Sequence, residues 1–120
     1  MMFRELKGIE GIDKLTECVP FVEEILSDRE MFDEFGKQDM TWMQAAAPIY
    51  KKHTESIEKI FEILEEEPES SIATLTKTAE IITSIFTDKE IKSFFIASCR
   101  NLRLMISAMA STEGEQSADS

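Results

Sequence analysis

Apolar residues recur along this chain at intervals of three and four, which places them on one face of an α-helix. Such stripes run through residues 12–26, 42–64, 72–86 and 91–109. Strand-rich folds need many turn residues, and the 120 residues include only 4 Gly and 3 Pro. The pattern therefore predicts an all-α fold, a compact bundle of about five to six helices.

Capping residues indicate where several of these helices begin. A Ser or Thr followed three residues later by Glu or Gln forms a capping box, and this pattern opens at Ser27, Thr41 and Thr87. A further start is expected at Ser70 or Ser71, after a stretch that ends in Pro68.

Glycine and proline indicate where helices are interrupted. Gly8 and Gly11 are expected to keep the first residues out of a helix, so that the first helical stripe begins at Ile12. Pro20 and Pro48 lie within helical stripes, and each predicts a kink or a break there.

Residues 12–35 and 72–95 resemble each other at an offset of 60. The positions that recur unchanged are Ile12, Leu15, Thr16, Ile25, Asp28, Glu30 and Phe35. Each copy is expected to form an amphipathic helix, a capped corner and a second helix that ends in Phe. We interpret the pair as a two-fold structural repeat, with chance similarity between amphipathic helices as the alternative. Two copies are fewer than a solenoid needs, which favours a closed bundle.

Composition divides the chain into one helical domain over residues 1–110 and a polar segment, 111–120, that is expected to be a disordered tail. The N-terminus has no signal-peptide run, and no apolar stretch is long enough to span a bilayer. We therefore expect a cytoplasmic protein that is neither secreted nor membrane-bound.

The formal net charge of −11 argues against nucleic acid as a partner, because phosphates repel an acidic surface. The charge is unevenly distributed: residues 55–69 contain seven Glu and one Lys, whereas 89–103 contain four basic residues and one Glu. These segments are expected to be complementary faces of one bundle, and a charged docking surface is the alternative.

The residue types that perform catalysis do not form a recognisable motif in this sequence. His53, the single histidine, has no metal-ligand partner at the usual spacing and is interpreted as a core-edge residue. Cys18 and Cys99 lie in apolar stretches and are expected to be buried free thiols. The closely spaced Glu residues are typical of a solvated helix face. The sequence therefore predicts a protein that is not an enzyme and needs no cofactor or metal.

The last helical stripe is apolar over more than one face, so it is either central in the bundle or in contact with another polypeptide. Methionine adapts its shape to varied apolar partners, which favours a binding role. The candidate partner-binding residues are Phe94, Phe95, Leu102, Met105, Ile106 and Met109. The same surface would also support a homo-oligomer, and a pure dimerisation module is a further possibility.

The chain resembles the tail assembly chaperones of long-tailed bacteriophages and prophages of Gram-positive bacteria. The resemblance covers most of residues 12–109. It lies in size, acidity and helical content, in Trp42 followed by Ile49 and Tyr50, and in the segment from Ile81 to Phe95. It implies a protein that acts in the host cytoplasm, binds the apolar helical tape measure protein, keeps it soluble and helps recruit tail tube subunits. Such proteins often also exist in a longer, frameshifted form, and the family has no fixed site residues to transfer.

A different function is compatible with the same sequence. An acidic helical adaptor or inhibitor would act on a partner protein through the Glu-rich face of residues 55–69. Charge reversal at Glu58, Glu62 and Glu65 would abolish that activity and high salt would weaken binding, whereas those charges would matter less for an apolar client surface.

Overall fold

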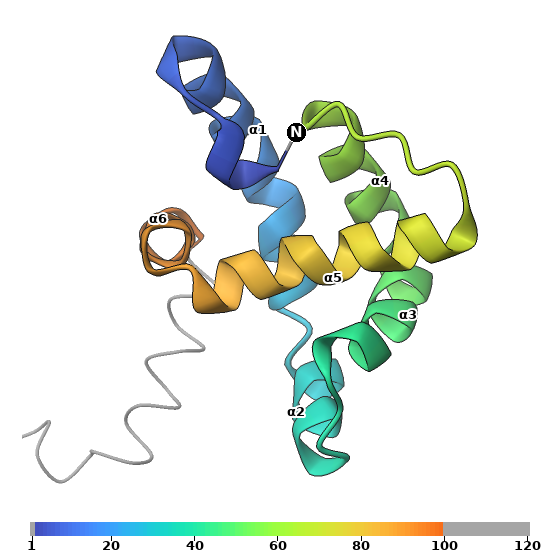
Figure 1. Ribbon diagram of the computed structural model, residues 1–120. Coiled ribbons are helices and arrows are strands. Elements are labelled where there is room, and N and C mark those ends of the chain that lie inside the picture. The colour runs from blue at the N-terminus through green and yellow to red at the C-terminus, as the bar shows by residue number, and fades with distance from the viewer. Residues whose placement is uncertain (1, 100–120) are drawn as a thin grey trace, which may run out of the picture.

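The computed structural model describes residues 2–99, which contain six α-helices, one short 3-10 helix and no strand (Figure 1). The elements are η1 (Phe3–Glu5), α1 (Gly8–Leu26), α2 (Arg29–Lys37), α3 (Trp42–Lys52), α4 (Thr54–Ile63), α5 (Ser71–Thr87) and α6 (Lys89–Ser98). The predicted all-α bundle of five to six helices is therefore confirmed. The expected polar tail, 111–120, lies outside the described residues, as does the end of the last predicted helix.

The helices pack around one apolar core, with α5 lying across α3 and α6, and α1 lying against α4 and α6 (Figure 1). Removing apolar side chains from water is the main stabilising contribution to such a core. Its fully buried members include Cys18, Leu26, Ile49, Ile57, Ile60, Leu64, Ile81 and Phe95. The expectation that both cysteines are buried and free is confirmed. No helix within residues 2–99 is long and apolar enough to cross a bilayer.

The first helix begins earlier than the glycines suggest. Gly8 opens α1 with φ of 70°, a left-handed conformation that glycine adopts without steric cost. Gly11 lies inside α1, where an added Cβ would stand 2.9 Å from the carbonyl carbon of Leu6. The prediction that Gly11 interrupts the helix is therefore wrong, because glycine here allows the preceding segment to fold closely onto α1.

Neither internal proline ends a helix. Pro20 lies within α1 and Pro48 within α3, and the break between α3 and α4 falls at His53 instead. His53 has φ −122° and ψ 42°, outside the helical range, and serves as both the last cap of α3 and the first cap of α4. The helical stripe of residues 42–64 is thus two helices joined at His53, five residues after the predicted kink or break at Pro48.

The expected capping box at Thr41 is confirmed. The Gln44 amide donates to Thr41 Oγ1 at 3.1 Å, and the Thr41 amide donates to Gln44 Oε1 at 2.9 Å. The start of α5 at Ser70 is confirmed as well, since Ser70 Oγ accepts from the Ala73 amide.

The other two corners are capped one residue later than predicted. Asp28 accepts from the Met31 amide at 3.2 Å, and Asp88 accepts from the Glu90 and Ile91 amides. Ser27 and Thr87 instead belong to the end of the preceding helix, where their hydroxyl groups donate to backbone carbonyl groups. Both copies of the repeat nevertheless have the predicted order of helix, capped corner and helix.

Candidate functional site

The predicted partner surface is only partly within the described residues. Phe94 is half-buried, whereas Phe95 is fully buried, with its ring centroid 5.3 Å from that of Phe3. The placement of Phe95 on a contact surface is therefore corrected: η1, which the sequence pattern did not reveal, covers this face of α6. The other candidates, Leu102, Met105, Ile106 and Met109, lie outside the described residues.

Within residues 2–99, the Glu-rich segment does not pack against the basic one. Figure 1 shows α4 and α6 apart, with α1 between them. Instead, Glu65 Oε2 lies 2.8 Å from Lys14 Nζ on α1, and Glu66 Oε1 lies 3.0 Å from Lys77 Nζ on α5. The expectation of complementary faces is therefore wrong for the described residues, because lysines of other helices pair with these carboxylates.

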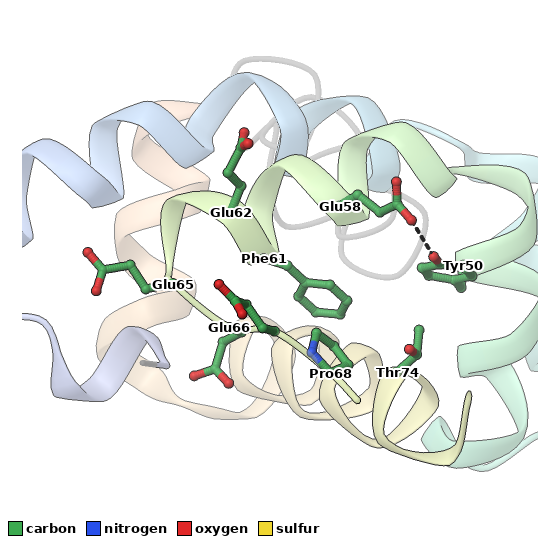
Figure 2. A pocket seen from close by; sticks show the side chains of 9 residues that line it. Tyr50, Glu58, Phe61, Glu62, Glu65, Glu66, Pro68 and Thr74 are labelled. Carbon is green, nitrogen blue, oxygen red and sulfur yellow. Dashed lines mark hydrogen bonds between the residues drawn. The ribbon is translucent and has the colours of Figure 1, made fainter. Parts of the chain in front are cut away.

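The Glu-rich segment instead borders a pocket of about 660 Å³ between the end of α4 and the start of α5 (Figure 2). It is lined by Tyr50, Glu58, Phe61, Glu62, Glu65, Glu66, Glu67, Pro68 and Thr74. Figure 2 shows the Phe61 ring in the middle, beside Pro68, with carboxylates around it. The hollow combines an apolar floor with an acidic rim, which suits a basic or amphipathic segment rather than an anion.

Two of these groups have altered acidity. The hydrogen bond that Tyr50 donates to Glu58, 2.6 Å long, raises the pKa of the tyrosine hydroxyl, because it places the tyrosine beside a carboxylate. The hydrogen bond from Lys14 lowers the pKa of Glu65. No group of three or more His, Cys, Asp or Glu side chains within residues 2–99 is arranged to hold a metal ion. The features of the pocket that a ligand would meet are its acidic rim and its apolar floor.

His53 is the centre of a partly buried polar network at the α3–α4 break. Its Nδ1 lies 3.0 Å from Glu24 Oε2 and its Nε2 lies 2.8 Å from Asp28 Oδ2. Ser56 donates to the second oxygen of Glu24, and Lys52 Nζ lies 2.9 Å from Asp28 Oδ2. The expected core-edge position of His53 is confirmed by its 8% exposure. The network joins four helices, and every member has a partner, so its geometry is that of a structural joint.

A separate apolar groove follows the outer face of α5. It measures about 520 Å³ and is lined by Met2, Trp42, Met43, Thr76, Ala79, Glu80, Thr83 and Ser84. Met43 is 50% exposed at one side, and Ile72 is 76% exposed on the preceding turn of the same helix face. Sequence reasoning assigned Ile72 to a buried stripe and did not single out Met43. The signal for this groove was the run of small residues at helical spacing after Ile72.

No known protein family, curated protein or solved structure matches the chain. The structure itself describes an all-α protein with an apolar groove along α5 and an acidic pocket between the end of α4 and the start of α5.

Proposed function

We propose that this chain is a non-enzymatic protein-binding factor, a tail assembly chaperone of a long-tailed phage or prophage. It acts in the host cytoplasm, holds the apolar helical tape measure protein in solution and helps recruit tail tube subunits. The sequence resemblance supports the family, and the groove on α5 supports a helical client.

The groove on α5 is the observation that carries the proposal. Ile72, Thr76, Ala79 and Thr83 follow one another at intervals of four, three and four, so they lie on one face of the helix. The small side chains in the middle let a second helix approach closely, and Met43 offers an apolar contact in the lining. Ile72 is exposed one turn before Thr76 on the same helix face and extends the apolar surface. A helix with an apolar stripe is the ligand that this shape fits.

The remainder of the molecule suits a protein that keeps its client in solution. The chain carries a net charge of −11, and like-charged complexes repel one another. An apolar contact face on a strongly acidic body lets one surface cover the client while the rest opposes aggregation.

Two matched substitutions test the proposal. Thr76→Asp introduces a charge in the groove, and Thr16→Asp introduces the same charge at the equivalent, exposed repeat position on α1. Each variant is co-expressed with a helical tape measure fragment from a long-tailed phage, and the soluble fraction of that fragment is measured after centrifugation. Wild type and Thr16→Asp should increase solubility several-fold, whereas Thr76→Asp should not.

Circular dichroism checks that both variants keep their helical content. The proposal fails if wild type leaves the fragment insoluble, or if the two aspartates have equal effects in folded protein.

The acidic pocket supports a second candidate function, an adaptor or inhibitor that binds a basic segment of a partner, because five glutamates line one hollow. Glu62→Lys is the cleanest test, since the Glu62 side chain is 73% exposed and its partner Lys59 lies 3.6 Å away on the same helix. Glu58 and Glu65 also hold Tyr50 and Lys14 in place. The adaptor function requires Glu62→Lys and high salt to abolish activity, whereas a chaperone tolerates both.

A further inference from the structure

The two copies of the repeat present matching helix faces, and in the second copy this face is covered. The N-terminal segment lies on α6, where Phe3 is only 4% exposed and packs against Phe95. The neighbouring Arg4 pairs with Asp88 at 2.6 Å and with Glu90 at 3.4 Å. An aromatic residue followed by a basic one thus seals the face of α6.

The equivalent face of α2 has no such cover. A hollow of about 510 Å³ lies there, and Phe35, which corresponds to the fully buried Phe95, is only half-buried. The hollow is lined by Glu30, Met31, Glu34, Phe35, Gln38, Met40, Pro48 and Lys52. The first four occupy the repeat positions of residues 90, 91, 94 and 95, and the N-terminal segment contacts residues 90 and 95 of this set.

In the first copy, another residue already forms the ion pair that Arg4 forms in the second copy. Lys52 Nζ lies 2.9 Å from Asp28 Oδ2, as Arg4 pairs with Asp88 in the second copy. The aromatic half is only partly supplied. Phe32 of the same helix packs edge-on against Phe35 at 5.6 Å between ring centroids, as Phe94 packs on Phe95, but no aromatic side chain from outside α2 lines the hollow as Phe3 covers Phe95. What remains is a space with an apolar floor beside an existing salt bridge.

The acidic side chains at the rim of the hollow indicate what charge its occupant would carry. Glu30 and Glu34 are exposed at the rim, and Glu34 stands where the second copy has Phe94. The α2 face is therefore more acidic than the α6 face. The one cation in the lining, Lys52, is paired with Asp28, so a second cation beside the aromatic ring would meet the carboxylates of Glu30 and Glu34.

We propose that the hollow on α2 is a docking site for a partner segment that presents an aromatic side chain next to a basic residue. The ring buries against Met31, Phe35 and Met40, and the basic residue pairs with Glu30 and Glu34. The chain's own Phe3 and Arg4, bound to α6, provide the template for this chemistry. The site is separate from the groove on α5, so it does not depend on the chaperone function.

The probe is a peptide with the sequence of residues 2–7, Met-Phe-Arg-Glu-Leu-Lys, with blocked ends. It is titrated into the full chain carrying 13C-labelled methionine methyl groups, and the methyl resonances are followed by NMR. We expect saturable shifts at Met31 and Met40 and none at Met43, which lies in the α5 groove. A peptide with Ser in place of Phe should give no shift.

Two variants of the chain sharpen the result. Reversing the exposed charges with Glu30→Lys and Glu34→Lys should raise the Kd about tenfold at low salt. Gly36→Ala should leave it unchanged, because a Cβ at that position meets open space. Absence of any saturable shift would overturn the proposal, and so would shifts confined to Met2, since the peptide would then be replacing the chain's own segment on α6.

Discussion

The two Asp-capped corners of the fold, Asp28 between α1 and α2 and Asp88 between α5 and α6, have the same local construction in different surroundings. Each aspartate caps the following helix and pairs with a cation from a distant segment, Lys52 in the first corner and Arg4 in the second. Only the first corner also contacts a buried histidine. Only the second is followed by a helix whose Phe is fully buried.

This difference shows which features the local sequence determines. The helix, the cap and the second helix follow from residues within a few positions of each other, and they recur in both copies. Burial of the second helix depends on what the rest of the chain places on it: η1 covers α6, whereas α2 keeps an open face. The same repeated sequence pattern therefore forms one helix pair whose second helix is covered and one whose second helix is partly exposed.

The largest effect is expected from truncating the two equivalent phenylalanines. Phe95→Ala empties a fully buried position and should lower the free energy of unfolding by about 3–5 kcal/mol. Phe35→Ala removes a half-exposed ring and should cost about 1–2 kcal/mol. Urea denaturation followed by circular dichroism measures both. Equal losses would show that α2 is as firmly packed as α6.

Removing the histidine should have the next largest effect. His53→Ala leaves two carboxylates, Glu24 and Asp28, without their shared partner and should cost about 2–3 kcal/mol. Lys52→Ala in the same network should cost less than about 1 kcal/mol, because that side chain is 54% exposed. A His53 loss no greater than the Lys52 loss would mean that the joint contributes no more than a surface ion pair.

The smallest effect depends on pH. Partial burial acts to raise the pKa of Asp28, but the hydrogen bonds from Lys52 and His53 outweigh it, so the pKa lies below its usual value. A lowered carboxyl pKa adds stability that is complete above the unfolded value, about 3.9, and is lost as pH falls through the folded value.

Asp28→Asn keeps a good cap but loses the charge, so it should cost about 1 kcal/mol at pH 7. This difference from wild type should shrink below about pH 4, as measured by thermal unfolding across that range. A difference that stays constant down to pH 2 would contradict the assigned role of the charge.

Patterns that act within one helical turn were predictable from the sequence. The Thr41 capping box and the helical stripes depend on neighbouring residues alone. The caps lie one residue later than predicted because Ser27 and Thr87 still belong to the end of the preceding helices.

Features that depend on distant segments were not predictable. Ile12 belongs to an apolar stripe, yet it is 62% exposed, because the packed elements leave its side of α1 uncovered. Phe95 was placed on a surface because nothing near it in sequence indicates that Phe3 lies on it. For the same reason, Met43 and Ile72 became candidates for a contact surface only when α3 and α5 were seen together.

The two buried thiols have a practical consequence. Burial raises the pKa of Cys18 to about 12 and that of Cys99 to about 11, so neither is a thiolate at neutral pH. The Cys99 thiol donates to the Val19 carbonyl of α1 at 3.7 Å, at the point where α6 ends. An alkylating reagent therefore reaches Cys99 when the end of α6 leaves α1, and Cys18 when the core itself opens. The alkylation rates of Cys99 and Cys18 would therefore report separately on the release of the end of α6 and on the opening of the core, without any substitution in the chain.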